Sequence, residues 1–515
     1  MSASDKPKQR KILGIKPDAR PGAQAPDKTR APVRGRHLPG TAKPRVRIAQ
    51  AVRSVQTEAP PRPHAEKDDR REPASGRTPG PSRHDRRKPV GPASAPGRAA
   101  TDRRRVTRRD SPRRPPREDD DARRRPHAVA DRHAFFVPCH KGLEAQLVDE
   151  LAEIGCADVR PAPGGAALRG SLQDAWRVNL WSRLAVRVLW RVTEGRYSQE
   201  SDLYDGALRV DWPALFTPSR SFAVHAVARR SPLKSLNFAA LKVKDGVCDR
   251  FRAVLGERPS VDTRSPEVPL VLYLGEERYS LYVDLSGEPL NRRGFRVEPA
   301  PAPLNENLAA GLLRLAGWHP GMPFFDPMMG GGTLLIEAAM WWLNRAPGLK
   351  RRFAFEHLEN FQPDAWRRLC REAEAAAHAP EPLPIFGADN DPAMLRAASR
   401  NLRAAGLLDC VQLQQADFLE VEAPPTQPGM LVSNPPYGVR LPHERMAAFY
   451  RALGDTLKRK YAGWSAHLIS ADPQLPRHIG LSASRRTPLF NGPLECRFYT
   501  YRLVAGSNRR ARPER

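Results

Sequence analysis

The chain has 515 residues, of which 53 are proline, and it carries 85 Lys and Arg against 57 Asp and Glu, a formal net charge of +28. The first 130 residues hold 35 of the bases, 15 of the acids and 20 of the prolines, but no Phe, Trp or Tyr. The rest of the chain has a net charge of only +8 and contains every aromatic residue. This division excludes a single ordinary globular domain.

Residues 1–130 lack the apolar side chains that offset the entropy cost of ordering a chain, so they are predicted to form a disordered basic extension. Arginine clusters such as 103–105 and 123–125 favour contact with phosphate backbones, and RNA binding is therefore expected. The alternative is a solvated leader that only aids solubility. Residues 506–515 form a second, short basic tail.

The six cysteines lie far apart, without the paired spacing that is typical of zinc or thiol redox sites. Reduced thiols and no metal are expected. No run of residues reaches the ~18 apolar positions that a membrane-spanning helix needs, and no apolar segment follows the charged amino terminus. A cytoplasmic protein is expected.

The pattern of residues 133–290 predicts one or two small α+β units. Phe135 to Pro138 is typical of a strand, and Leu143 to Ile154 has the spacing of an amphipathic helix ended by Gly155. Between Leu172 and Val192 a helical stripe is expected to pass into a β-rich run. The stripe consists of Trp176, Leu180, Leu184 and Val188.

Basic side chains gather in the second part of this region, beside apolar ones. The apolar residues are Phe222, Phe238 and Leu241. The basic residues are His225, Arg229, Arg230, Lys234, Lys242 and Lys244. A nucleic-acid-binding face and an ordinary solvated helix face both fit this spacing, and the five Arg and Lys residues are candidate RNA ligands.

From residue 291 onward, strands, loops and helices alternate, which predicts a doubly wound, Rossmann-like α/β domain over 291–505. Its first helix, with Leu308, Leu312 and Leu315 on one face, is expected to be capped by Asn305. Residues 347–384, rich in Arg, Ala and Glu, are interpreted as an insertion of helices after the first strand-helix unit.

The segment 323–333 predicts a strand that ends at Asp326, a turn with three consecutive glycines, and then a helix over 334–343. Glycine permits backbone conformations closed to other residues and lets a ligand approach the main chain, as a nucleotide-like cofactor would. A tight structural turn explains the glycines equally well. The turn lacks the Lys of a phosphate-binding P-loop.

Two more strands are expected to end in acids, at Asp389 and at Asp417. An acid at the end of the second strand holds a ribose diol in nucleotide-binding α/β folds, while the alternative is a helix N-cap. The insertion accounts for the unusual separation between Asp326 and Asp389. Asp417 alone says almost nothing.

The strand 430–433 runs into Asn434, Pro435, Pro436 and Tyr437. The two rigid prolines fix an amide, a carbonyl and an aromatic ring around one point at the carboxyl end of a strand, where open α/β sheets bind ligands. Two acceptors on the N–H groups of an exocyclic amine would aim its lone pair at an incoming carbon, and positioning of this kind supplies ~7–11 kcal/mol. The four residues are therefore predicted to be catalytic.

These segments resemble the ordered motifs of S-adenosylmethionine-dependent N-methyltransferases. Three further stretches resemble the THUMP-containing RlmL type, bacterial methyltransferases that act on guanine N2 of 23S ribosomal RNA. They are Phe136 to Glu144, Arg258 to Asp262, and Leu281 to Gly287 followed by Asn291 to Arg296. The resemblance covers about residues 133–505. It implies a ferredoxin-like plus THUMP RNA-binding region over 133–290, before a Rossmann-like methyltransferase domain.

Carried over residue by residue, the resemblance implies an S-adenosylmethionine site, with the methionine part near Asp326, the ribose at Asp389, the adenine at Asp417 and the target base at Asn434 to Tyr437. The full set of implied cofactor residues is Asp326, Pro327, Gly330, Gly332, Thr333, Asp389, Asp417 and Asn434. The family usually has Cys and Ser where this chain has Met329 and Gly331.

The expected partner is 23S ribosomal RNA or its assembly particle, without a membrane. Because the chain ends soon after Val504, the second, guanine-N7 domain of some relatives is expected to be absent. Two alternatives stay open: a tRNA guanine-N2 or adenine-N6 methyltransferase, and a catalytically silent RNA-binding protein of ribosome assembly.

Overall fold

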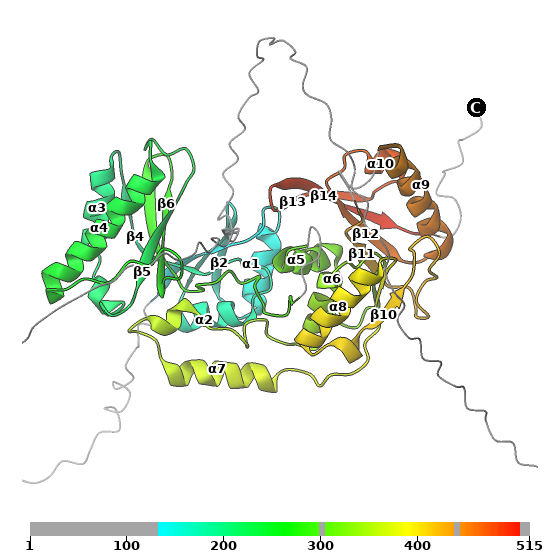
Figure 1. Ribbon diagram of the computed structural model, residues 1–515, viewed down its shortest axis with the longest axis horizontal. Helices are drawn as coiled ribbons and strands as arrows, with labels where there is room; N and C mark the ends of the chain where they lie inside the picture. Colours follow the sequence, from blue (N-terminus) through cyan, green and yellow to red (C-terminus); the bar gives the residue numbers. More distant parts are fainter. Residues whose placement is uncertain (1–131, 298–303, 437–442, 505–515) are drawn as a thin grey trace, which may run out of the picture. The chain divides into compact units, whose positions relative to one another are not determined.

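A computed structural model describes residues 132–297, 304–436 and 443–504 (Figure 1). The predicted basic extension over 1–130, the short tail over 506–515 and Tyr437 lie outside the described residues. None of the helices in the described ranges combines the length and the apolar character that crossing a bilayer requires. All six cysteines lie within the described residues, as thiols outside any disulfide bond.

The first part of the chain builds one seven-stranded sheet in the order β2-β3-β1-β4-β7-β6-β5. Its elements are β1 (His133–Pro138), α1 (Glu144–Glu153), β2 (Asp158–Ala162), β3 (Gly165–Gly170), α2 (Leu172–Trp181), β4 (Leu189–Arg196), α3 (Glu200–Leu208), η2 (Trp212–Ala214), β5 (Phe222–Ala228), α4 (Leu236–Leu255), β6 (Val268–Leu274) and β7 (Arg278–Asp284). The antiparallel pairing of β4 with β7 joins two α+β units into a continuous sheet.

The predicted helical stripe between Leu172 and Val192 is wrong in its second half. Helix α2 ends at Trp181, and the buried residues Leu184 and Val188 lie in the connection to β4. The cause is the buried carboxylate of Glu150, which accepts hydrogen bonds from the Ser182 hydroxyl (2.5 Å) and from the backbone N–H groups of Arg183 (2.9 Å) and Leu184 (3.2 Å). These contacts draw the chain out of the helix, whose backbone would otherwise use the same N–H groups.

The second part builds a mixed sheet in the order β10-β9-β8-β11-β12-β14-β13. Its elements are α5 (Glu306–Ala316), β8 (Phe324–Asp326), α6 (Thr333–Trp342), η3 (Ala354–His357), α7 (Pro363–Ala375), β9 (Ile385–Asp389), α8 (Pro392–Ala405), η4 (Leu408–Cys410), β10 (Gln412–Gln415), β11 (Met430–Ser433), α9 (His443–Lys460), β12 (Ser465–Ser470), α10 (Leu475–His478), β13 (Arg485–Asn491) and β14 (Leu494–Arg502). This confirms the predicted Rossmann-like α/β class.

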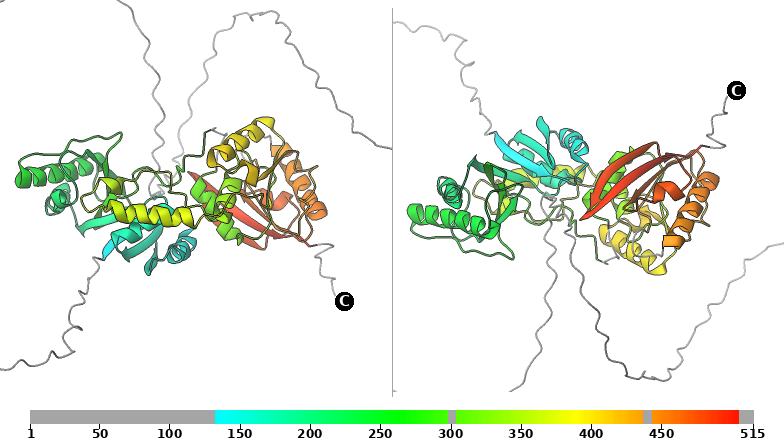
Figure 2. Two further views of the ribbon diagram at one scale, coloured as in Figure 1. Left: turned by 90° about the horizontal axis from the view of Figure 1, so that it is seen from below. Right: turned by 90° about the horizontal axis from the view of Figure 1, so that it is seen from above.

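Strands β8 to β12 of this sheet are parallel, and β14 and β13 extend it as antiparallel neighbours. Helices α5, α6 and α8 pack in one core with one face of the sheet, whereas α9 and α10 pack in a second core (Figure 2). Asn305 caps α5 as predicted, since its side chain accepts the N–H of Asn307. Because β8, β9, β10 and β11 are parallel, the four motif strands point their carboxyl ends to one edge of the sheet.

The insertion over 347–384 contains one α-helix, α7, and the short turn η3, and it packs on the first part of the chain. The ring of Phe355 stacks on Trp176 of α2, with ring centroids 5.5 Å apart. The N–H of Gly348 donates to the Leu180 carbonyl, and the N–H of Phe355 donates to the Leu285 carbonyl. The insertion therefore fastens the second sheet to the first.

A buried charge cluster joins the same two parts. Glu337 of α6 is fully buried, and its carboxylate lies 2.7 Å from Nε of Arg293 and 3.8 Å from Nη1 of Arg183. Nη2 of Arg183 donates to the carbonyls of Met340 and Arg345, next to the end of α6. Such a cluster is costly to break because it leaves the remaining charges buried without a counterion.

We predict that Glu337→Gln lowers the free energy of unfolding by ~3 kcal/mol, because two buried guanidinium groups lose their carboxylate. Asp364→Asn, which removes the acid of the exposed Arg367–Asp364 pair, is the matched control and should cost less than ~1 kcal/mol. Urea denaturation measures both. Equal shifts of the two midpoints would contradict a structural role for the cluster.

Candidate functional site

The parallel pairing of β8 with β11 places the glycine turn beside the Asn-Pro-Pro corner. Ser433, the last residue of β11, is fully buried, and its hydroxyl donates to Oδ1 of Asp326 at the end of β8 (2.7 Å). The N–H of Met328 donates to the same oxygen at 3.3 Å. One carboxylate thus ties together two loops that are more than 100 residues apart in the sequence.

Burial sets the chemistry of this carboxyl group. Asp326 is 2% exposed, and removal from water raises its pKa to about 7, while the hydrogen bonds from Ser433 and Met328 oppose the rise and the nearby charge of Asp389 adds to it. The group is therefore only partly ionised near neutral pH in the free protein.

The glycine turn is open toward the edge of the sheet. Gly330 adopts a left-handed conformation (φ 52°), and a Cβ built on it would meet no atom within 4 Å. Its N–H donates to Oδ2 of Asp389 (2.9 Å), the residue that ends β9. Gly332 (φ 79°) precedes α6 and would bring a Cβ to 3.1 Å from the Cβ of Ala398. Gly330 therefore faces free space, whereas Gly332 packs against α8.

The acids predicted from the sequence gather at this edge. Asp389 also accepts the N–H of Asp391, and burial raises the pKa of Asp389 against these two hydrogen bonds. Asp417, which follows β10, accepts the N–H of Leu419 (2.8 Å) and lies 3.4 Å from the side-chain amide of Asn390. It is Asp391, not Asp389, that caps α8, by accepting the N–H of Ala393. Both Asp389 and Asp417 keep lone pairs for a ligand's donors.

Asn434 is the unusual side chain of the site. Its Oδ1 is buried and has no hydrogen-bond partner among the residues that the structure describes. Pro435 is buried and Pro436 half-buried, so the corner is held by packing. A buried acceptor without a partner costs ~1–3 kcal/mol, and ligand donors are what would satisfy it.

The two remaining cofactor candidates are buried. Pro327 is packed behind the turn, and Oγ1 of Thr333 accepts a hydrogen bond from Nη2 of Arg296 (3.2 Å). Arg296 also pairs with Glu306 (2.7 Å). The contacts of Arg296 hold Thr333 at the start of α6.

The two residues that differ from the family's usual glycine turn, Met329 and Gly331, are each held by packing or hydrogen bonds. Met329 is buried, and its sulfur lies where a Cβ on Gly387 would come within 2.7 Å, so the side chain fills the core against β9. The carbonyl of Gly331 accepts the side-chain amide of Asn401 (3.0 Å), and Oδ1 of Asn401 accepts the N–H of Val297. Sequence reasoning missed Asn401, because nothing in α8 marks it, and also missed Ser433, whose position just before Asn434 was a usable signal.

The candidate RNA ligands divide into two groups. Lys234 precedes α4, and Lys242 places its ammonium 5.3 Å from the Phe238 ring centroid, with Phe238 and Leu241 both exposed. Phe238, Leu241 and Lys242 share one face near the start of α4, and Lys234 lies just before that helix. Lys244 lies two positions farther along the helix than Lys242, and it forms an ion pair with the adjacent Asp245. Phe222 is fully buried in β5 and takes no part in a surface, contrary to the sequence interpretation.

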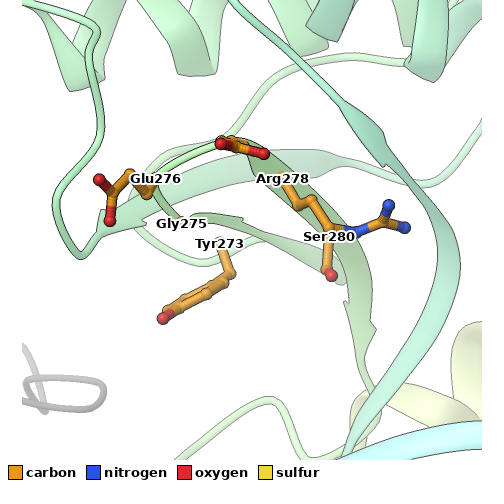
Figure 3. A pocket seen from close by; sticks show the side chains of 6 residues that line it. Tyr273, Gly275, Glu276, Arg278 and Ser280 are labelled. Atoms are coloured by element: carbon orange, nitrogen blue, oxygen red, sulfur yellow. The ribbon is translucent and has the colours of Figure 1, made fainter.

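Arg229 and Arg230 follow β5 and are exposed. Arg230 adopts φ 60° and lies 4.0 Å from Glu276, in the turn between β6 and β7. Glu276 also lines a pocket of that hairpin, together with Tyr273, Gly275, Glu277, Arg278 and Ser280 (Figure 3). This pocket contains none of the motif residues of the second sheet. Within the described ranges, no three His, Cys, Asp or Glu side chains are grouped to hold a metal ion.

Three family models match the chain: an RlmL ferredoxin-like domain over 134–189, a THUMP domain over 197–284 and an RMKL-like methyltransferase domain over 293–500. The ribosomal RNA large subunit methyltransferase K/L of Syntrophotalea carbinolica is 39% identical over 72% of this chain and 53% of its own length. The chain thus spans about half the length of that relative. The Synechocystis protein slr0064 is 35% identical over 72% of this chain and 96% of its own length.

Solved structures agree with these matches. The structure of SMU.472, determined in complex with SAH, has a TM-score of 0.67 and 28% identity, and covers 73% of this chain and 99% of its own. TrmN from Thermus thermophilus, at 21% identity over 72% of this chain and 99% of its own, shares the fold with a TM-score of 0.54.

We predict that Asp326→Asn increasingly stabilises the free protein, relative to the wild type, as the pH rises. The folded protein binds the Asp326 proton more tightly than the unfolded chain does, so this group's contribution to stability falls between pH ~4 and pH ~7. Between pH 5 and 7.5 the difference in unfolding free energy should grow by roughly 2 to 3 kcal/mol. Denaturation without cofactor measures it, and a difference independent of pH would contradict the shifted pKa.

Proposed function

The chain belongs to the RlmL type of THUMP-containing methyltransferases, and from this premise we propose that it transfers a methyl group from S-adenosylmethionine to N2 of a guanine in 23S ribosomal RNA. Relatives named for large-subunit ribosomal RNA support the substrate class. The choice of guanine N2 rests on the resemblance of the chain's motifs to the RlmL type.

The residues at the edge of the second sheet fit S-adenosylmethionine. The cofactor presents a sulfonium cation, ribose hydroxyls and an adenine amine, and the edge presents Asp326, Asp389 and Asp417, which supply negative charge and acceptors. The open space beside Gly330 admits a ligand against the main chain. The related SMU.472 structure contains SAH, the demethylated form of this cofactor. When bound, the cofactor supplies an electrophilic methyl group.

The single observation that carries the proposal is the buried Oδ1 of Asn434, which has no hydrogen-bond partner within the described residues. An exocyclic N–H would donate to it, and the neighbouring carbonyl of Pro435 is a second acceptor fixed by the proline ring. Such acceptors favour a tetrahedral nitrogen, whose lone pair is no longer delocalised into the base. The substrate amine then becomes a nucleophile by positioning alone.

Proton transfer needs no strong base at this corner. The amine loses its proton after alkylation, when the nitrogen is acidic, and water at the open edge accepts it. Asp326 would serve as the anchor of the corner, because its Oδ1 is occupied by the Ser433 hydroxyl. Its role is to hold Asn434 beside the glycine turn.

RNA would be held by the first part of the chain. Near the start of α4, Lys234 and Lys242 lie beside the exposed Phe238 and Leu241. The ammonium groups would bind phosphates, and the Phe238 ring would stack on a base. Arg229 and Arg230 add charge at the end of β5. The basic residues 1–130 would add contacts that carry no sequence preference.

Nucleoside analysis of separated RNA species from a deletion strain tests the proposal. Loss of one N2-methylguanosine from 23S RNA is the expected result. An unchanged 23S profile would overturn it, and a loss in tRNA, or of N6-methyladenosine, would reassign the substrate. If calorimetry finds no binding of S-adenosylmethionine even at high micromolar concentration, the silent RNA-binding alternative replaces the proposal.

We predict that Asn434→Ala lowers kcat for methyl transfer by ~10²- to 10³-fold, while the Kd values for RNA and for S-adenosylmethionine change little, because the lost acceptor acts mainly at the reacting nitrogen. Asn434→Asp, which keeps an acceptor oxygen, is the matched variant and should retain part of the activity. A parallel loss of RNA affinity in the alanine variant would count against this role.

We also predict that deletion of residues 1–130 weakens RNA binding and flattens its dependence on salt, because the deletion removes 35 basic residues. The melting temperature should stay that of the full chain. Filter binding at several salt concentrations, with calorimetric melting as the control, measures both effects. A large fall in melting temperature would place structural contacts in the deleted segment.

A further inference from the structure

The two antiparallel strands of the second sheet bring arginines to the edge that holds the Asn-Pro-Pro corner. Ser433 pairs with Leu468 of β12, Leu468 pairs with Tyr499 of β14, and Arg497 pairs with Ser470, two positions farther toward the carboxyl ends of the parallel strands. Because neighbouring strands lie ~4.8 Å apart, β14 is ~10 Å from β11. Arg497 is therefore about level with the corner and two strands away from it.

A second arginine lies on the same face. Arg486 of β13 pairs with Tyr499, whose side chain shares a face with that of Arg497 because side chains alternate along a strand. The charges of Arg497 and Arg486 both act on the buried Tyr499 hydroxyl, where burial raises the pKa and the two arginines oppose that rise. The two guanidinium groups therefore belong to one patch.

Arg486 and Arg497 are exposed, and neither forms an ion pair with a carboxylate in the part of the chain that the structure describes. The nearby acid is Asp472, which also acts on Tyr499. Its Oδ2 accepts the Tyr450 hydroxyl (3.1 Å) and its Oδ1 accepts the N–H of Gln474 (2.8 Å). Within the described residues, both guanidinium groups of this patch are thus left to contact an anionic ligand beside the candidate active site.

We propose that Arg486 and Arg497 bind backbone phosphates of the RNA strand next to the target nucleotide. A base reaches a pocket at a strand edge only when its nucleotide is turned out of the helix or lies in a loop, and the flanking backbone must then be held. Guanidinium groups hold phosphates through paired charge-assisted hydrogen bonds. This patch would be a third RNA contact, separate from those proposed for α4 and for the basic extension.

This inference rests on the proposed function, because it assumes an RNA substrate at the Asn434 corner. The patch would orient the RNA backbone beside the target nucleotide for the reaction, whereas α4, in the first part of the chain, would contribute affinity for more distant RNA. An acidic protein segment is the other anionic partner that such a patch would attract, and the test separates the two.

The test compares the full chain with two variants, Arg486→Ala/Arg497→Ala and Arg485→Ala. Arg485 is also exposed and is the neighbour of Arg486 in β13, but it pairs with Thr500 and therefore points to the opposite face. It controls for net charge and for strand stability. In-vitro transcribed 23S RNA is the probe, and its Kd is measured at several salt concentrations together with KM and kcat for methyl transfer.

For the double variant we expect the KM for RNA to rise on the order of tenfold or more, and the slope of log Kd against log salt to fall by ~1 to 2. The value of kcat at saturating RNA and the Kd for S-adenosylmethionine should stay near the wild-type values. Arg485→Ala should leave the salt slope nearly unchanged. Arg486→Lys/Arg497→Lys should restore most of the slope, which a misfolded variant could not do.

The same effect per removed arginine in Arg485→Ala as in the double variant would overturn the inference, because net charge alone would then explain both. An unchanged salt slope and KM in the double variant would also overturn it and would leave an acidic protein as the partner. A failure of the proposed function looks different: the wild-type chain itself would transfer no methyl group to 23S RNA.

Discussion

The hydrogen bond between the Ser433 hydroxyl and the Asp326 carboxyl group is the contact on which the candidate site depends. It joins the ends of β8 and β11, which are neighbours in the sheet but lie more than 100 residues apart in the sequence. The parallel pairing of β8 with β11 places Gly330 and the Asn434 corner on the same edge, and the bond ties the ends of the two strands together there. The pairing thus brings the place for a cofactor next to the place for a base.

The same edge shows how burial and chemistry are linked. Asp326 is removed from water and keeps only part of its charge in the free protein, while the buried Oδ1 of Asn434 has no partner in the part of the chain that the structure describes. Both features cost stability. A bound cation would offset the burial of the Asp326 carboxylate, and an amine donor would satisfy the Asn434 acceptor. Rigid packing elsewhere, through Glu337 and the insertion, compensates for a corner that is left unsatisfied.

Much of this arrangement was predictable from local sequence. The strands that end at Asp326 and Asp389, the strand that runs into Asn434 and the N-cap at Asn305 follow from apolar periodicity and from Asn, Pro and Gly at fixed positions. Contacts between distant segments were not predictable: Glu150 ends α2 early, β4 joins two units into one sheet, and Asn401 supports the glycine turn. Each depends on which strands become neighbours, and residue spacing does not carry that information.

The most direct measurement is a structure of the full chain with a cofactor analogue and an RNA fragment that contains the target nucleotide. The account predicts that Oδ1 of Asn434 accepts a hydrogen bond from the exocyclic nitrogen of the base, at ~2.7–3.2 Å, with the cofactor beside Gly330. A base held elsewhere, with Asn434 bonded only to the protein, would contradict it.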